Sequence, residues 1–210
     1  MVEGSGENRL WRGTAPLLLA SKSAARRALL DAARLPFEVV SVDVDERAIE
    51  AQAVDEGADP AGIALTLARA KALAGAAAHP GRVVIGADQT LALGDEAFHK
   101  PADRAAAKAQ IARLAGRTHK LHSAVAVARD GEVLWATVES AHLTLRPLDD
   151  AALEAYLDAA GEAVLSSVGG YQLEELGIHL FERVEGDHSV ILGLPLLPLL
   201  GFLRSEGLLL

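Results

Sequence analysis

Hydroxyl and guanidinium groups gather near the start of this chain, where a short apolar segment leads into Ser21, Ser23 and Arg26. The pattern predicts a strand over 17–20 and a helix over 24–33 that begins directly after the serines. Unpaired N–H groups and the dipole at a helix start attract anions, and hydroxyls and guanidinium groups donate to phosphate oxygens. The segment therefore predicts a phosphate-binding site, although an ordinary capped helix with solvated arginines has the same residues.

Carboxylates at two positions could bind a metal ion or activate water. Asp88 follows an expected buried strand, 82–87, and the carboxyl ends of strands often carry metal ligands or general bases. Glu46 lies in an acidic group after a second expected strand, 37–44. If the fold brings Glu46 to Asp88, the pair could hold Mg²⁺ together with substrate phosphates. Otherwise, Asp88 is an ordinary aspartate in a turn, and Glu46 is a solvated surface glutamate.

Two lysines add positive charge to the same prediction. Lys71 lies in an Ala- and Leu-rich helix expected over 60–78, and Lys100 precedes Pro101, which favours an extended approach. A lysine on a half-apolar helix is usually a surface residue, so each signal is weak alone. Together with Arg26, the two lysines carry enough positive charge for a triphosphate.

A glycine-rich segment near residue 170 could contact a nucleotide base. Gly169-Gly170 is followed by a tyrosine, Gln172 and Glu174, which offer a ring for stacking and two groups for edge recognition. A tight turn with a solvated glutamate is the plain alternative. His119 and His122 lie three apart in an expected strand and face opposite sides, so they do not predict a zinc site.

Strand and helix patterns mix throughout the chain, with one strong hairpin signal at Asp130-Gly131. This mixture predicts an α/β fold with a mixed β-sheet, flanking helices and a central cleft rather than a purely parallel sheet. The remaining expected helices are 103–114, 149–159 and 194–204, and the remaining expected strands are 119–129, 133–145 and 178–184.

Composition limits the classes of function. The 210 residues carry a net charge of −9, so a broad nucleic-acid-binding surface is not expected. The absence of cysteine excludes disulfides and fits a cytoplasmic protein. Residues 1–15 are expected to form a flexible tail before one domain over 16–205. The apolar run 190–203 is too short and too rich in Pro and Gly to span a membrane.

Eight short motifs occur in an order that resembles Maf proteins, over nearly the whole chain from 16 to 204. They are Leu-Ala-Ser-x-Ser with arginines, Asp-Val-Asp-Glu, Ala-Lys-Ala, Gly-Ala-Asp, Lys-Pro, Gly-Arg-Thr-His, Gly-Gly-Tyr and Gly-Leu-Pro-Leu. The resemblance implies an inosine-triphosphatase-like α/β fold, usually a homodimer. It also implies hydrolysis of nucleoside triphosphates to a monophosphate and pyrophosphate with a divalent metal, Mg²⁺ or Mn²⁺.

The resemblance assigns roles to individual residues. Ser21, Ser23 and Arg26 match the phosphate-binding opening, and Lys71 and Lys100 match the family's lysines. Asp88 matches its catalytic acid and Glu46 its glutamate, which together would hold the metal. Gln172 and Glu174 fall in the segment tied to base choice.

The chain also departs from the family pattern. Ser-Pro-Arg-Arg is replaced by Ser23-Ala-Ala-Arg26, and Arg27 lies ~100° further round the helix. Several segments resemble the YceF-type branch, which favours 7-methyl-GTP, but Glu175 and Gly170-Tyr171 resemble the branch that prefers thymidine and uridine triphosphates. A house-cleaning pyrophosphatase is the favoured function. A nucleotide-binding regulator of septum formation and cell division is the alternative, and a phosphatase that removes only the terminal phosphate is a third possibility.

Overall fold

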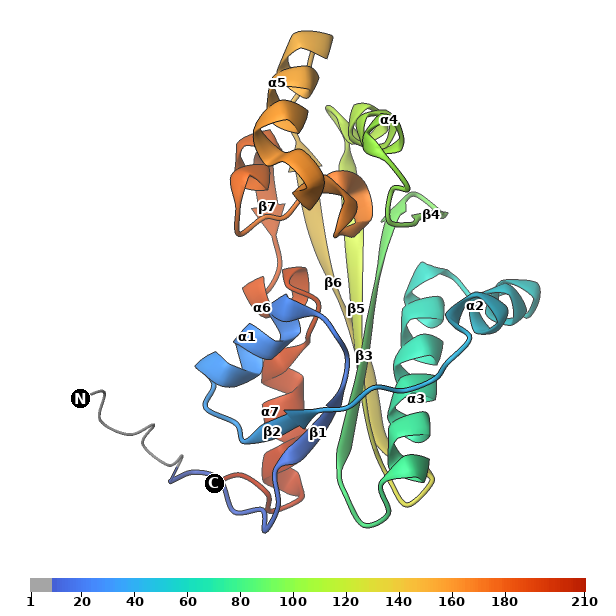
Figure 1. Ribbon diagram of the computed structural model, residues 1–210, viewed down its shortest axis with the longest axis vertical. Coiled ribbons are helices and arrows are strands. Elements are labelled where there is room, and N and C mark those ends of the chain that lie inside the picture. Colours follow the sequence, from blue (N-terminus) through green and yellow to red (C-terminus); the bar gives the residue numbers. More distant parts are fainter. Residues whose placement is uncertain (1–8) are drawn as a thin grey trace.

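The computed structural model describes residues 9–210, which form a mixed seven-stranded sheet with helices on both faces (Figure 1). The strand order is β2-β1-β3-β5-β6-β7, and β4 pairs with β3 beside this path. β1 runs parallel to β2 and β3, and all other pairs are antiparallel. The predicted α/β class with a mixed sheet is confirmed. The strands are β1 (Leu17–Ala20), β2 (Phe37–Val39), β3 (Val84–Leu93), β4 (Glu96–Phe98), β5 (Thr118–Arg129), β6 (Glu132–Leu145) and β7 (Phe181–Glu185).

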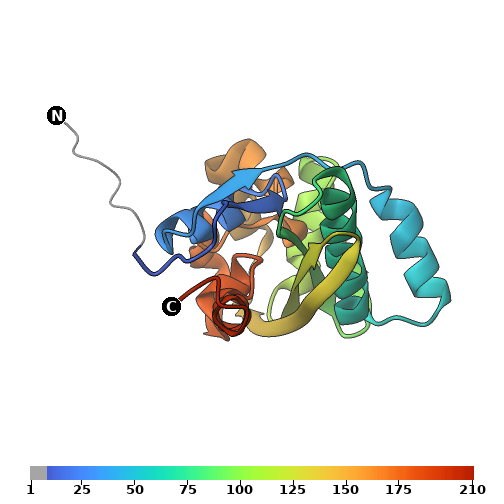
Figure 2. The same ribbon diagram turned by 90° about the horizontal axis from the view of Figure 1, so that it is seen from below.

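Helices cover both faces because the buried strands are apolar on both sides. Leu17 and Leu19 pack towards α1 and α7, whereas Leu18 and Ala20 pack towards α3, whose contact face is largely alanine. Figure 2 shows α3 on one side of the sheet with α2 outermost, and α1 and α7 on the other. The helices are α1 (Ala24–Ala32), α2 (Glu46–Asp55), α3 (Pro60–Ala78), α4 (Arg104–Leu114), α5 (Asp150–Ala160), α6 (His188–Ile191) and α7 (Leu196–Ser205), with short 3₁₀ turns η1 (Gly161–Leu165), η2 (Val168–Gly170) and η3 (Leu176–Leu180).

The hairpin between β5 and β6 forms where the sequence predicted it. Its two turn residues, Asp130 and Gly131, have φ values of 52° and 82°. Positive φ at both positions gives the turn a twist that matches that of the flanking strands. The long hairpin is therefore set locally, and its two strands form, together with β3, the surface against which α3 packs.

Three predicted strands have wrong boundaries, and one predicted connection is part of a helix. The second strand ends at Val39 rather than 44, and the third extends to Leu93 rather than ending at 87. The polar connection expected at 45–47 instead starts a helix, α2, with Asp45 as its N-cap. The last strand begins at Phe181, because residues 176–180 form the 3₁₀ turn η3. β4 and α6 were not predicted.

The first and last segments of the described residues, 9–210, lie close together. Within the predicted tail, residues 1–8 lie outside the described residues, but Trp11 forms a β-bridge with Leu209 and packs on the core beneath α7. The tail prediction is therefore too long at its C-terminal end.

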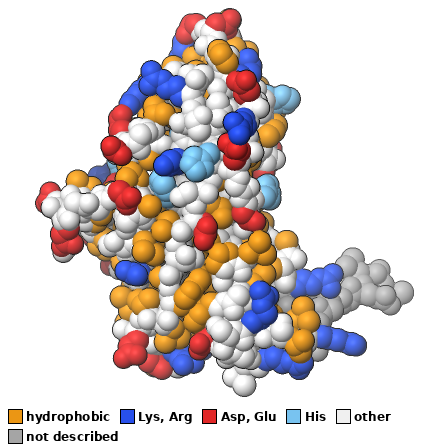
Figure 3. Space-filling model, turned by 180° about the vertical axis from the view of Figure 1, so that it is seen from behind, with side chains coloured by type: hydrophobic (Ala, Val, Ile, Leu, Met, Phe, Trp, Pro, Cys, Tyr) orange, Lys and Arg blue, Asp and Glu red, His pale blue; other side chains and the backbone are white. Residues whose placement is uncertain are grey.

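One described helix, α3, is long and apolar enough to cross a membrane by length and composition alone. Its face containing Ala64, Ala68 and Ala72 is fully buried against the sheet. The same test is passed by core helices of this kind, so α3 is weak evidence for a membrane span. In Figure 3, acidic and basic side chains are scattered over the face among hydrophobic ones, and no continuous basic surface is seen there.

Candidate active site

A gap along one edge of β3 creates the site. β1 pairs with β3 only as far as Ala20 opposite Gly86, and β4 pairs with β3 only from Leu91 onward. Residues 87–90 therefore have no strand beside them on this edge, and Asp88, Gln89 and Thr90 border a cavity. The prediction that Asp88 follows the end of a strand is corrected: Asp88 lies inside β3, at the point where its neighbour β1 has ended.

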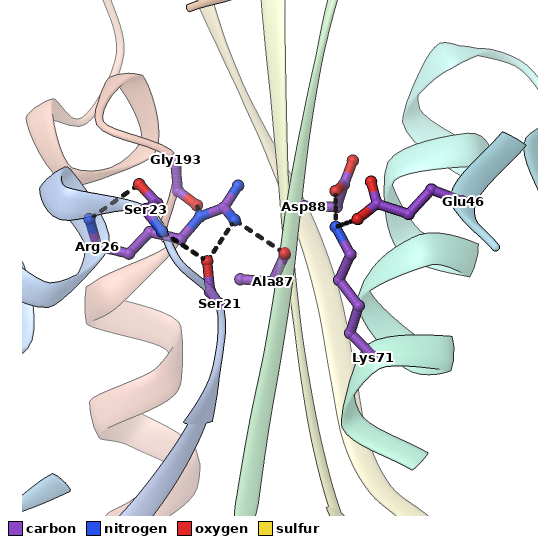
Figure 4. A network of polar contacts seen from close by, with 8 residues as sticks. All are labelled: Ser21, Ser23, Arg26, Glu46, Lys71, Ala87, Asp88 and Gly193. Carbon is purple, nitrogen blue, oxygen red and sulfur yellow. Dashed lines mark hydrogen bonds and ion pairs between the residues drawn. The ribbon is translucent and has the colours of Figure 1, made fainter. Parts of the chain in front are cut away.

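Arg26 reaches this gap from α1, whose N-cap is Ser23. Its Nε donates to the carbonyl of Gly193 at 2.8 Å, and its Nη1 donates to the carbonyl of Ala87 at 2.9 Å and to Ser21 Oγ at 3.0 Å (Figure 4). Burial lowers the Arg26 pKa, while Asp88 and Glu46 oppose that shift. The guanidinium remains charged at neutral pH and is held in one orientation.

A second polar group lies across β3 from Arg26. Lys71 Nζ lies 2.6 Å from Asp88 Oδ1 and 3.0 Å from Glu46 Oε1 (Figure 4). Lys71 and Asp88 are buried, whereas Glu46 is half exposed at the start of α2. One ammonium therefore contacts two carboxylates, one from a strand and one from a separate helix, and offsets part of their negative charge.

Gly86 explains how Lys71 comes so close to Asp88. A Cβ at Gly86 would lie 2.2 Å from the carbonyl oxygen of Ala68 and 2.4 Å from the amide nitrogen of Ala72, both in α3. Only glycine permits this approach of helix and strand. Gly86 and Asp88 face the same side of β3, because side chains alternate along a strand. Lys71, between the two contact points on α3, therefore meets Asp88.

A single cavity of about 720 Å³ is lined by all nine residues predicted to form the site. Lys100 comes from the segment after β4, and Gln172 and Glu174 come from the segment after η2. Arg27 is exposed and is absent from this lining, as its position on the helix predicted. The nine are Ser21, Ser23, Arg26, Glu46, Lys71, Asp88, Lys100, Gln172 and Glu174.

The polar lining residues outside the predicted nine include Gln89, Glu50 and His99. Gln89 Nε2 donates to Ser123 Oγ at 2.9 Å and to the carbonyl of Ile191 at 3.0 Å, which ties β3 to α6. Glu50 lies one helical turn after Glu46 and pairs with His99 at 3.6 Å. The spacing of four between Glu46 and Glu50 could have identified the second glutamate only if α2 had been predicted as a helix.

Two carboxylates fit a metal that also binds substrate. The described residues contain no group of three or more His, Cys, Asp or Glu side chains arranged for a metal. Mg²⁺ commonly takes one or two protein carboxylates together with water and substrate phosphates. Asp88 and Glu46 fit that requirement, provided that Lys71 releases them.

The chain is similar to known proteins of one family. The family model described as Maf-like protein matches residues 16–206, nearly the whole chain. The chain belongs to the Maf family. The resemblance drawn from eight motifs is thereby confirmed.

Curated Maf relatives match at high identity over almost their full length. A nucleoside triphosphate pyrophosphatase of Bradyrhizobium diazoefficiens is 60% identical over 95% of this chain and 98% of its own. A nucleoside triphosphate pyrophosphatase of Rhodopseudomonas palustris is 57% identical over the same shares. A 7-methyl-GTP pyrophosphatase of Brucella abortus is 52% identical over 92% of this chain and 97% of its own.

Proposed function

We propose that this Maf protein hydrolyses nucleoside triphosphates to a nucleoside monophosphate and pyrophosphate. The relatives named as pyrophosphatases support the reaction. The observation that carries it is the meeting of Arg26, Lys71, Asp88 and Glu46 on one cavity, although they come from four separate elements. Cations and carboxylates at one place suit a reaction that binds phosphates and activates water.

The fixed groups divide into binding and activating roles. Arg26, Lys100 and the hydroxyls of Ser21 and Ser23 bind the phosphate chain. Within the described residues Arg26 Nη2 has no hydrogen-bond partner, so it is available to a phosphate oxygen. Asp88 orients the attacking water through Oδ2, the oxygen that Lys71 does not contact. The water oxygen bonds to the α-phosphorus and gives a proton to Asp88 Oδ2. The bond between the α-phosphorus and the oxygen that bridges to the β-phosphorus breaks, and pyrophosphate leaves with the electron pair.

Asp88 and Glu46 would hold Mg²⁺ or Mn²⁺. A divalent cation there supplies charge stabilisation to the phosphate oxygens in the transition state. Lys71 must then give up at least one carboxylate, and its ammonium becomes available to the phosphates. The three cations Arg26, Lys71 and Lys100 would thus face the substrate together.

Substrate choice depends on the other wall of the cavity. Glu174 lines it from the segment after η2, and a carboxylate there favours a positively charged base such as 7-methylguanine. The Brucella abortus relative is named for 7-methyl-GTP, which supports that choice, and thymidine and uridine triphosphates are the alternative.

A cytoplasmic location and a homodimer remain predictions from the sequence.

A product assay tests the proposal. We expect the purified protein with Mg²⁺ or Mn²⁺ to release pyrophosphate from 7-methyl-GTP, dTTP or UTP. Asp88→Asn should keep the fold, as judged by circular dichroism, and lower turnover by at least about a hundredfold. Orthophosphate as the only product would favour a phosphatase, and nucleotide binding without turnover would favour the cell-division regulator. Near-normal pyrophosphate release by Asp88→Asn would remove Asp88 from the mechanism.

A further inference from the structure

The loop 166–174 forms one wall of the cavity and is attached to the core through Tyr171. This side chain is 4% exposed, and its ring packs edge-on against Phe181 with centroids 4.9 Å apart. Gly169 and Gly170 precede it with φ values of 81° and 74°, so the backbone turns sharply before the tyrosine enters the core. The loop continues directly into Gln172 and Glu174 on the cavity wall.

His119 meets Tyr171 from the sheet. The imidazole Nε2 and the tyrosine hydroxyl form a hydrogen bond of 2.5 Å, and the ring centroids are 5.6 Å apart. His119 is fully buried in β5, and its Nδ1 is buried without a hydrogen-bond partner among the described residues. Two motifs 52 positions apart, Gly-Arg-Thr-His and Gly-Gly-Tyr, therefore meet inside the core.

Both partners are neutral at physiological pH. Burial lowers the pKa of His119 to about 4, and burial also raises the pKa of Tyr171. Burying a neutral pair with one unpaired nitrogen lowers the stability of the fold, because that nitrogen loses its hydrogen bonds to water. An apolar pair of similar shape would avoid this desolvation. In return, the hydrogen bond fixes the orientation of the two side chains relative to each other, which apolar packing alone does not do.

We propose that His119 and Tyr171 are positioning residues, whose hydrogen bond fixes the loop 166–174 so that Gln172 and Glu174 face the nucleotide base. The inference rests on the proposed function of the cavity as a nucleotide site. It assigns the pair to base recognition, while Arg26, Lys71 and Lys100 bind the phosphates. Weakening the pair should therefore affect the base end and spare the phosphate end.

Tyr171→Phe is the direct test, because it removes the hydroxyl and keeps the ring. We expect the dissociation constant for the best nucleotide substrate to rise about tenfold, since one net hydrogen bond is lost from the loop's support. The dissociation constant for inorganic tripolyphosphate, which has no base, should stay within about twofold. The KM should rise with the dissociation constant, and kcat should change little.

Two histidine variants check that the bond itself matters. His119→Gln places an amide near the position of Nε2 and should keep most of the nucleotide affinity. His119→Asn places its amide near Nδ1, out of reach of the hydroxyl, and should behave like Tyr171→Phe. The matched control is Ser140→Ala, which removes the hydroxyl 2.7 Å from Nδ1 of His122 on the opposite face of β5. Ser140→Ala should change neither the affinity for nucleotide nor the affinity for tripolyphosphate.

The outcomes are distinct. Equal weakening of nucleotide and tripolyphosphate binding, or none, would overturn the proposal, as would equal behaviour of His119→Gln and His119→Asn. A wild-type protein that binds nucleotide but releases no pyrophosphate would refute the proposed hydrolysis, yet the binding contrast would still decide the role of the pair. A wild-type protein that binds no nucleotide would overturn both.

Discussion

Lys71 lies where a cation bound to both acids would lie. Its ammonium contacts Asp88 and Glu46 at 2.6 and 3.0 Å, and these are the two proposed metal ligands. Two neighbouring carboxylates repel each other unless positive charge lies between them. Lysine therefore stabilises the pair of carboxylates, and it would oppose the proposed metal binding until phosphates attracted it away. Metal and nucleotide should accordingly bind together more readily than metal alone.

Lys71→Met tests this competition. Without nucleotide, we expect Mn²⁺ to bind about tenfold more tightly to the variant, because the two carboxylates lose their resident cation. Isothermal titration or the electron paramagnetic resonance signal of free Mn²⁺ measures the affinity directly. Lys100→Met is the matched control: Lys100 lines the same cavity, and within the described residues it forms no ion pair. Equal Mn²⁺ affinity in wild type and Lys71→Met would argue against Asp88 and Glu46 as ligands.

At the scale of elements, the site depends on how closely α3 approaches β3. Gly86→Ala would force Cβ against the backbone of Ala68 and Ala72, which a helix can relieve only by moving away. We expect a loss of about 2–3 kcal/mol in the free energy of unfolding. Turnover should fall as well, because Lys71 moves with the helix. Urea denaturation and the pyrophosphate assay measure the two effects.

Gly201→Ala provides the comparison for that substitution. Gly201 lies within α7, and a Cβ there would meet nothing within 4 Å. Alanine is the better helix former, so this variant should gain up to about 1 kcal/mol. If Gly86→Ala were as stable as Gly201→Ala, close helix–strand approach would not be what positions Lys71.

The same elements show what the sequence could and could not predict. The β5–β6 hairpin and α3 were predicted because their signals are local: Asp130-Gly131 at one turn and Pro60 at the first helical position. α2 was missed because only Ala53 of that helix is buried, which leaves no apolar stripe to detect. Asp88 was placed at a strand end because periodicity reveals where a strand is buried, not where its neighbour stops.

The identities of the site residues could be predicted from the sequence, but the contacts between them could not. Arg26, Lys71 and Asp88 were singled out by residue type and by the ordered motifs, but their distances depend on the pairing of β1, β3 and α3. The contact between His119 and Tyr171 spans 52 positions, and neither residue has a local pattern that indicates the other. Long-range pairing of this kind is a product of the complete fold.

At the scale of the whole molecule, buried histidine should make stability depend on pH. The folded-state pKa of His119 is about 4, below the usual value near 6.5, so the unfolded chain binds more protons between those values. The stabilisation is fully present above about pH 6.5 and is lost as pH falls towards 4. His119 alone should remove about 2 kcal/mol of unfolding free energy between pH 7 and pH 5.

Comparing wild type with His119→Gln isolates this contribution. Burial also lowers the pKa of His122, which adds a loss of the same sign to both proteins. Hydrogen bonds from Ser189 lower the pKa of Asp187, whose stabilisation is lost only at more acidic pH. Urea denaturation at pH 7, 6 and 5 should therefore give a steeper decline for wild type than for His119→Gln. Parallel declines would mean that His119 takes up a proton in the folded protein as readily as in the unfolded chain, which its complete burial beside Tyr171 should prevent.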